Sequence, residues 1–295
     1  MRPVRPRLLS ERGAAAADLP PLREVIAQFD LGARKSLGQH FLLDLNITRR
    51  IAREAGPFDG ETVLEIGPGP GGLTRALLES PAQAVIAIER DSRAIAALKI
   101  LEDAYPERLK PVEGDALGIL PSDLISEGDS LTIVANLPYN IAQKLLVGWL
   151  RDLAAIRSMT LMFQKEVADR LRASTGDKAY GRLSVITAWL CEIDTLFDLP
   201  PAAFVPPPKV TSTVVRLTPR AEPLAPADFR TLERVTAAAF GQRRKMLRSA
   251  LRSLTTDPIA LLESSGIDPT LRAENLSVEE FCALARACDR IDGAQ

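Results

Sequence analysis

The chain has 295 residues, of which 46% are hydrophobic and 25% are charged, and its net charge is −1. This length predicts two domains, because domains typically hold about 100–200 residues. No apolar run approaches the roughly 20 residues of a membrane-spanning helix. The three cysteines lack CxxC spacing, which argues against a disulfide framework or a zinc site and favours a reducing compartment. The single histidine, His40, excludes a histidine-rich metal site, so no metal is predicted.

The first 18 residues combine several arginines with a run of alanines. A transit peptide shares part of this pattern, but Glu11 and Asp18 interrupt it and no secretory apolar core is present. We therefore expect a short, disordered basic extension. Helices are predicted next at 20–29 and 44–55, with a polar, glycine-containing loop at 34–42 between them.

Strand and helix signals alternate from residue 62 onward. Short apolar strands are predicted at 63–66, 84–88, 110–113, 131–135, 158–163, 183–190 and 210–217. Helices are predicted at 73–79, 92–105, 142–153 and 165–173. Short apolar strands that alternate with helices predict an α/β fold, in which a parallel sheet is covered by helices on both faces.

The last quarter of the chain has a different pattern. Residues 218–228 contain three prolines among alanines and charged residues, which is typical of a linker. Only helices are predicted beyond it, at 229–239, 243–254, 258–264 and 277–291. We expect a catalytic domain at 19–217, a linker at 218–228 and a small all-helical domain at 229–295.

A glycine-rich segment at 65–72 lies between the first strand and its helix. Glycine lets the backbone approach a ligand closely, and a helix start offers free N–H groups. Such a loop is equally compatible with a dinucleotide, but Pro68 and Pro70 remove two N–H donors that would hold phosphates. The carboxylate of Glu65 also suits a zwitterionic amino-acid ligand better than a doubly anionic phosphate bridge.

Acidic residues follow the next two strands. Glu89 comes 22 residues after Gly67, where a carboxylate can accept both ribose hydroxyls of a nucleoside. Asp115 ends the third strand and can accept from an adenine amino group. Each could singly be a solvated loop acid or a helix cap. Their joint placement at one edge of a sheet favours a nucleoside site.

The fourth strand is followed by Asn136-Leu137-Pro138-Tyr139. The Asn136 amide oxygen and the Leu137 carbonyl can accept from an exocyclic –NH2, and Tyr139 can stack on a flat ring. The alternative is a simple strand-to-loop exit, in which Pro138 ends the pairing and Tyr139 is half buried.

Together, the segments 65–72 and 136–139 with Glu89 and Asp115 resemble the motifs of S-adenosylmethionine-dependent methyltransferases acting on adenine N6. The segments 35–42 and 204–210 narrow the resemblance to the ribosomal RNA adenine dimethyltransferase family, and within it to the bacterial small-subunit enzymes. The resemblance covers about 19–287. His40 stands where some relatives, especially large-subunit resistance methylases, have asparagine, and a main-chain contact is an open alternative there.

The resemblance implies a Rossmann-like methyltransferase sheet with S-adenosylmethionine as cofactor. It implies that the cofactor is bound by Gln39, His40, Leu42, Gly67, Gly69, Glu89, Asp115 and Asn136. It also implies that the target adenine meets Asn136, Leu137, Pro138 and Tyr139, and lies between the rings of Tyr139 and Phe204. Two stacking rings would help to offset the cost of extruding a base.

Five basic residues lie between 240 and 252 without an acidic neighbour, namely Arg243, Arg244, Lys245, Arg248 and Arg252. On a helix, the 244, 248 and 252 positions would form one stripe. A charge run is usually a solvated face, but the resemblance favours contact with the RNA backbone.

We expect a cytoplasmic, monomeric enzyme that makes N6,N6-dimethyladenosine at two adjacent adenosines near the 3′ end of small-subunit (16S) ribosomal RNA, acting on the immature small subunit. A large-subunit adenine methylase and a non-catalytic ribosome-assembly factor remain alternatives. A nicotinamide dehydrogenase is disfavoured by the two prolines of the glycine loop.

Overall fold

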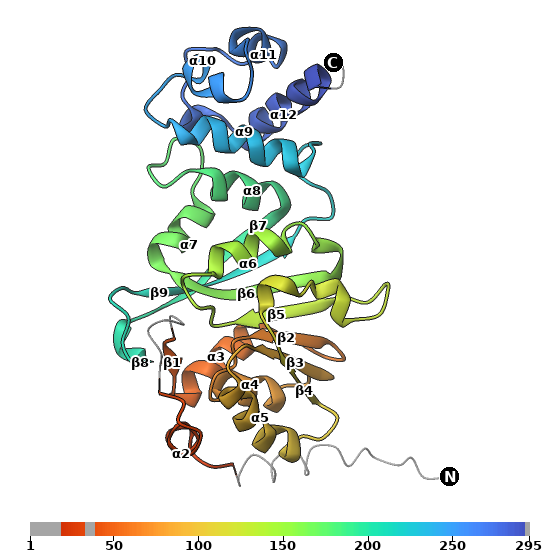
Figure 1. Cartoon of the computed structure of the whole chain (residues 1–295), viewed down its shortest axis with the longest axis vertical. Coiled ribbons are helices and arrows are strands. Elements are labelled where there is room, and N and C mark those ends of the chain that lie inside the picture. The colour runs from red at the N-terminus through yellow and green to blue at the C-terminus, as the bar shows by residue number, and fades with distance from the viewer. Residues whose placement is uncertain (1–18, 33–38, 293–295) are drawn as a thin grey trace. The chain divides into compact units, whose positions relative to one another are not determined.

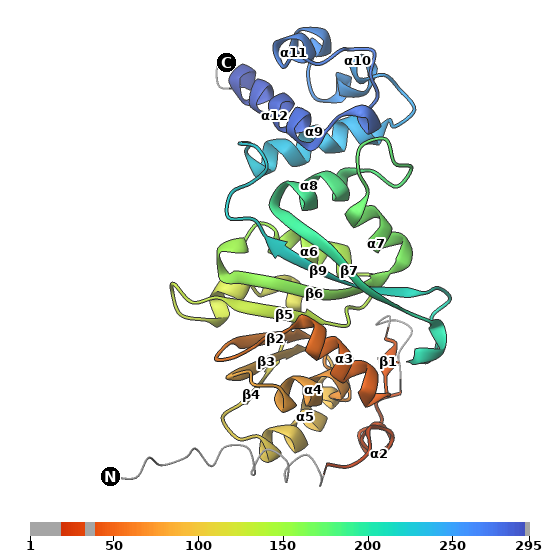
Figure 2. The same ribbon diagram turned by 180° about the vertical axis from the view of Figure 1, so that it is seen from behind.

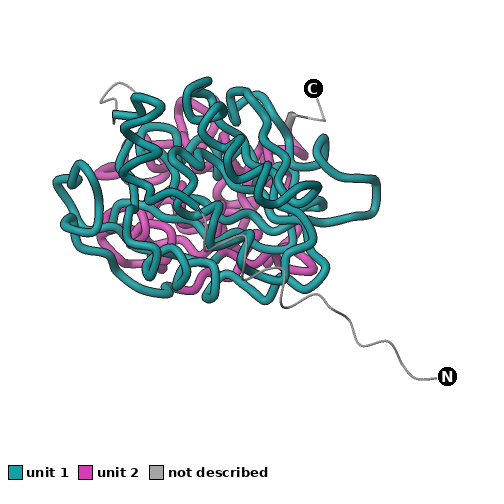
Figure 3. The backbone as a smooth tube through the Cα atoms, turned by 90° about the horizontal axis from the view of Figure 1, so that it is seen from below, with its two compact units in different colours: residues 1–165, 195–216 teal, residues 166–194, 217–295 magenta. Residues whose placement is uncertain are grey.

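The computed structural model describes residues 19–32 and 39–292. The expected extension at 1–18, and residues 34–38 of the expected loop, lie outside this range. The chain divides into two compact units, coloured separately in Figure 3. The first unit comprises Met1–Lys165 and Thr195–Arg216, and the second comprises Glu166–Asp194 and Leu217–Gln295. The sequence analysis assigns residues 166–194 to the catalytic domain. In the structure they group with the C-terminal helices instead.

The main sheet has seven strands in the order β4-β3-β2-β5-β6-β9-β7. These strands are β2 (Thr62–Ile66), β3 (Ala84–Glu89), β4 (Leu109–Glu113), β5 (Leu131–Ala135), β6 (Ile156–Gln164), β7 (Cys191–Leu199) and β9 (Ser212–Pro219). The first five in chain order pair in parallel. Because β2 lies between β3 and β5, the strand order reverses beside it, and ligands bind outside the carboxyl ends of strands at such a reversal.

Helices of the first unit cover both faces of this sheet. They are α2 (Leu22–Gln28), α3 (Leu45–Ala55), α4 (Gly72–Glu79), α5 (Ser92–Ala104) and α6 (Ala142–Trp149). The helices α3, α4 and α5 lie on one side of the strands and α6 lies on the other (Figures 1 and 2). Central strands are buried on both faces, as Val63, Val85 and Ile133 show, so the prediction of a Rossmann-like sheet is confirmed.

The second unit is mainly helical. It contains α7 (Lys165–Arg172, of which Lys165 belongs to the first unit), α8 (Arg182–Leu190), α9 (Phe229–Gly241), α10 (Leu247–Ala250), α11 (Pro258–Ser264) and α12 (Val278–Asp292). Asp228 caps α9 by accepting from the Thr231 N–H at 2.9 Å, and Asp257 caps α11 in the same way through Ala260. Buried Phe281, from α12, packs its ring 5.4 Å from that of Phe240 in α9.

The strand predicted at 183–190 is wrong, because this segment forms the helix α8. It is apolar on nearly every side, and such a run does not distinguish a buried strand from a buried helix. The Ser184 hydroxyl accepts from the Gly181 N–H at 3.0 Å, which stabilises the helix start. The strand follows instead as β7, directly after the helix.

The helix predicted at 243–254 is also wrong in its first turn. Met246 has extended backbone angles, φ −65° and ψ 152°, and helix begins only at Leu247. The Leu247 N–H donates to the Leu271 carbonyl at 2.7 Å, and the Arg248 N–H donates to the Pro269 carbonyl at 3.2 Å. In a helix that began at 243, these N–H groups would donate to carbonyls of the helix itself. Because Arg244 lies before the helix start, Arg244 and Arg248 do not form one stripe on a helix.

Candidate active site

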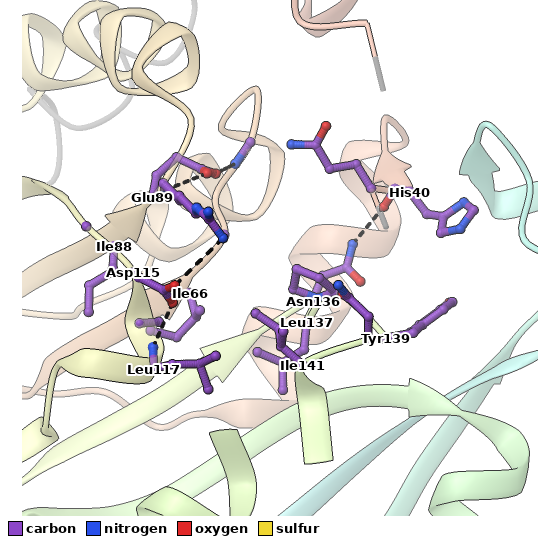
Figure 4. A pocket seen from close by; sticks show the side chains of 18 of the residues that line it. His40, Ile66, Ile88, Glu89, Asp115, Leu117, Asn136, Leu137, Tyr139 and Ile141 are labelled. Atoms are coloured by element: carbon purple, nitrogen blue, oxygen red, sulfur yellow. Dashed lines mark hydrogen bonds and ion pairs between the residues drawn. The ribbon is translucent and has the colours of Figure 1, made fainter. Parts of the chain in front are cut away.

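A pocket opens at the carboxyl ends of β2, β3, β4 and β5 (Figure 4). The empty space of the pocket, including its open mouth, is about 970 Å³. Its lining includes most of the predicted site residues: Gln39, His40, Gly67, Gly69, Glu89, Asp115, Asn136, Leu137, Pro138 and Tyr139. The first unit alone supplies all of them.

Several apolar lining residues were not predicted from the sequence. Ile66, Ile88 and Leu117 project into the pocket beside the acidic groups (Figure 4). Ile66 and Ile88 are the partners of one register pair at the ends of β2 and β3. Their position directly before Gly67 and Glu89 is the signal that could have identified them.

The glycine loop turns sharply beside Phe41. Gly69 has φ +54°, and a Cβ atom added there would lie 2.9 Å from the Phe41 ring. Gly71 has φ +86° and caps α4 in the left-handed conformation. Both positions therefore require glycine, since a side chain is strained at these angles and Phe41 fills the space at the first of them.

The Glu89 carboxylate is buried and already receives three backbone N–H groups. Oε1 accepts from Arg90 at 2.8 Å and Asp91 at 2.9 Å, and Oε2 accepts from Gly69 at 3.1 Å. Burial raises the pKa of Glu89, while these three bonds lower it. Each carboxylate oxygen has two lone-pair sites, so the group is held in place with one site left, on Oε2, for a ligand hydroxyl.

Asp115 is more exposed than Glu89, with 48% of its side chain accessible. Its Oδ1 accepts from the Leu117 N–H at 3.0 Å, and its Oδ2 lies 3.7 Å from the Arg90 guanidinium. These contacts keep the carboxylate at the pocket edge in the position where β4 ends.

Glu65 directly precedes Ile66, which lines the pocket, and is only 1% exposed. Its pKa is raised to about 8, mainly by burial; Thr74 opposes this rise and the neighbouring Glu89 charge adds to it. The Oε2 atom has no hydrogen-bond partner within the described part of the chain. Burial therefore favours the protonated form of Glu65.

Asn136 lies where β5 ends, at the edge of the pocket. Its Nδ2 donates to the main-chain carbonyl of His40 at 3.1 Å. Tyr139, three residues later, lies with its ring centroid 5.6 Å from that of His40, at an interplanar angle of 29°. The Tyr139 hydroxyl is 2.6 Å from the Ser212 hydroxyl at the start of β9, so both ends of the tyrosine are fixed.

Two predicted site residues lie outside the pocket lining. Leu42 and Phe204 are register partners in the small antiparallel sheet of β1 (Phe41–Leu42) and β8 (Phe204–Val205). They are 5% and 2% exposed and pack in the hydrophobic core. The structure thus presents His40, not Phe204, as the ring beside Tyr139.

The predicted RNA-binding residues lie in the second unit and differ in their surroundings. Arg243 forms an ion pair with Glu274, with 2.8 Å between Nε and Oε2. Arg244, Lys245, Arg248 and Arg252 are exposed, and within 19–32 and 39–292 none of these four forms an ion pair. The last four are therefore the candidates for contact with an outside anion. Arg248 also lies near Asp268, whose pKa is lowered by Thr270 hydrogen bonds and by the Arg248 charge.

In the described residues, no helix has the length and apolar character needed to cross a membrane. Nor do those residues gather three or more histidine, cysteine, aspartate or glutamate side chains in a way that could hold a metal ion.

Comparison with known proteins identifies the family. The model of the ribosomal RNA adenine dimethylase family matches residues 31–290. The chain belongs to this family. It is 61% identical over 272 residues to "Ribosomal RNA small subunit methyltransferase A" of Rhodospirillum rubrum, covering 92% of this chain and 93% of that protein. It is 62% identical over 282 residues to the protein of the same name from Paramagnetospirillum magneticum, covering 95% and 99%.

Two solved structures have a similar fold. A dimethyladenosine transferase from Plasmodium falciparum superposes with a TM-score of 0.73 at 27% identity, covering 86% of this chain and 98% of that one. The 23S rRNA methyltransferase ErmE superposes with a TM-score of 0.62, also at 27% identity, covering 84% and 99%. The resemblance inferred from the sequence motifs is confirmed.

Proposed function

We propose that this chain dimethylates N6 of two adjacent adenosines near the 3′ end of small-subunit (16S) ribosomal RNA, with S-adenosylmethionine as methyl donor, during maturation of the small subunit. Family membership and the relatives at about 60% identity support the RNA class. The observation that carries the chemistry is the placement of Asn136 and Tyr139 at the rim of a pocket that also contains Glu89 and the glycine loop.

The residues of the pocket fit the cofactor. Glu89 offers its remaining Oε2 lone pair to a ribose hydroxyl, and Asp115 can accept from an adenine amino group. Between these acids, Ile66, Ile88 and Leu117 form an apolar surface for a purine. Close approach to the backbone is possible at Gly67, where the nearest atom to an added Cβ is 3.9 Å away. S-adenosylmethionine supplies an electrophilic methyl group bound to a sulfonium.

The chain's own contribution to transfer is to orient the accepting amine. Adenine N6 is a poor nucleophile because its lone pair is delocalised into the ring. Asn136 Oδ1 and the Leu137 carbonyl accept from the amino group and hold its lone pair toward the methyl donor. Tyr139 stacks on the base and fixes its plane. Orientation and fixed dipoles then provide most of the acceleration. The methylated N6 is cationic and acidic, so it releases its proton to water and no general base is assigned.

Four exposed cations of the second unit are proposed to contact RNA phosphates: Arg244, Lys245, Arg248 and Arg252. Arg243 is assigned to holding Glu274 instead.

We further propose that the enzyme is a cytoplasmic monomer acting on the immature small subunit. We retain catalytic and helical domains at 19–217 and 229–295, joined by a linker at 218–228. The near-neutral net charge is compatible with RNA binding, because a local basic patch is enough to steer a polyanion.

Replacing Asn136 tests the chemistry. Asn136→Ala should lose methyl transfer by at least a hundredfold, because the amine loses an acceptor, while S-adenosylmethionine binding measured by equilibrium dialysis stays within about threefold. Asn46→Ala is the matched control, since Asn46 is an exposed asparagine of α3 outside the pocket. Near-normal methylation by Asn136→Ala would contradict the mechanism.

A large-subunit methylase is the second candidate, because the chain shares its fold and 27% identity with ErmE. Primer extension across both ribosomal RNAs after reaction separates the two. Stops at adjacent adenosines in the small-subunit RNA alone support the first proposal.

A further inference from the structure

His40 makes three contacts that join separate parts of the first unit. Its main-chain carbonyl accepts from Asn136 Nδ2 at 3.1 Å, at the end of β5. Its ring nitrogen Nδ1 lies 2.7 Å from the Pro206 carbonyl, just after β8. Its ring stacks on Tyr139. We propose that His40 is a positioning residue that sets the amide orientation of Asn136 for the incoming adenine amine.

The direction of the Asn136 amide follows from the chemistry of its partner. A carbonyl oxygen can only accept, so the amide must turn its Nδ2 toward His40. Oδ1, the only acceptor of that side chain, then faces away from the His40 carbonyl (Figure 4). If the amide flipped, two oxygens would face each other and an N–H group would face the donor hydrogens of adenine N6. The His40 carbonyl therefore selects the orientation that can accept from the amine.

The side chain of His40 holds this carbonyl in place. The strand β1 begins only at Phe41 and pairs through just two residues, Phe41 and Leu42, so pairing alone gives residue 40 little support. The Pro206 carbonyl can only accept, which requires the Nδ1 atom of His40 to carry a hydrogen. This bond ties residue 40 to the segment that follows β8, and the Tyr139 ring closes the remaining side.

The inference rests on the proposed function, since it concerns the group that accepts from adenine N6. Two substitutions separate the anchoring bond from the ring. In His40→Asn, the same number of covalent bonds separates the amide Nδ2 from Cα as separates the histidine Nδ1 from it. The hydrogen bond to the Pro206 carbonyl can therefore persist without a ring. In His40→Phe, the ring remains and the donor is lost.

The measurement is kcat at saturating S-adenosylmethionine and saturating RNA, which removes effects on either affinity. His40→Phe should lower kcat at least tenfold, because misplacing a reacting group by about 1 Å costs on the order of 100-fold. His40→Asn should keep kcat within about threefold of the parent. His40→Ala, which loses both features, should match His40→Phe and serves in its place if the bulky ring prevents folding.

Two results would overturn the inference: a kcat of His40→Phe and His40→Ala within twofold of the parent, or an equal loss in His40→Asn and His40→Phe. A merely structural role predicts the second result, because rescue by asparagine would then have no basis. If Asn136→Ala is inactive while His40→Phe is fully active, this inference alone fails. If Asn136→Ala is itself active, the proposed function of the motif fails.

Discussion

The buried carboxyl group of Glu65 should make the stability of the protein depend on pH in an unusual direction. Its native pKa of about 8, raised mainly by burial, lies far above the ordinary value of 4.5. The native state therefore holds a proton that the unfolded chain releases between these two values. Unfolding becomes easier as pH rises through this window, because the proton stabilises only the native state. The contribution is fully present below about pH 4.5 and is lost above about pH 8.

Glu65→Gln keeps the shape of the side chain and removes its ionisation. Each pH unit inside the window changes the unfolding free energy by about 1.4 kcal/mol. Between pH 5 and pH 8, the stability of the glutamine variant relative to the parent should therefore rise by as much as about 4 kcal/mol. Thr74, which favours the ionised form, already limits the pKa of Glu65 to this value.

Urea unfolding of both proteins at pH 5, 6, 7 and 8, followed by circular dichroism, measures this difference. Glu127→Gln is the matched control, since Glu127 is an exposed glutamate, and its difference from the parent should stay constant across the series. A constant difference for Glu65→Gln as well would refute the reasoning that the group is neutral in the folded protein.

Two further predictions concern the glycine loop and the RNA contacts. Gly69→Ala should lower the unfolding free energy by on the order of 1–3 kcal/mol, from left-handed strain and contact with the Phe41 ring, and weaken cofactor binding. Gly148→Ala in α6, with open space around it, is the control for calorimetry and should not destabilise. Replacing Arg244 and Lys245 together by glutamine should reduce the slope of log K for RNA against log salt by about 1.4, at about 0.7 per phosphate contact, in filter-binding assays. An unchanged slope would remove them from the interface.

The sequence predicts the pocket well because its chemistry is local. Glu89, Asp115 and Asn136 each come directly at or after the end of a strand, and parallel strands bring those ends to one edge. Nothing beyond the strand pattern is needed to place them together. The same reasoning locates the glycine loop, since it joins β2 to α4.

Residues whose neighbours are distant in the chain could not be placed in this way. Phe204 is buried because it pairs with Leu42 across the small sheet, a contact that no local pattern encodes. The His40 bond to Pro206 spans 166 residues. The first turn of the predicted helix at 243–254 is absent because Leu247 finds its acceptor at Leu271. In each case a tertiary contact overrides the local preference.

We propose that the pocket at Asn136 methylates adenine in small-subunit RNA. The most direct measurement is incubation of the full chain with methyl-labelled S-adenosylmethionine and unmethylated small subunits, followed by nuclease mapping of the labelled nucleosides. We expect label only in N6,N6-dimethyladenosine at two adjacent positions near the 3′ end. Label in another base, in large-subunit RNA, or in no RNA at all would contradict it.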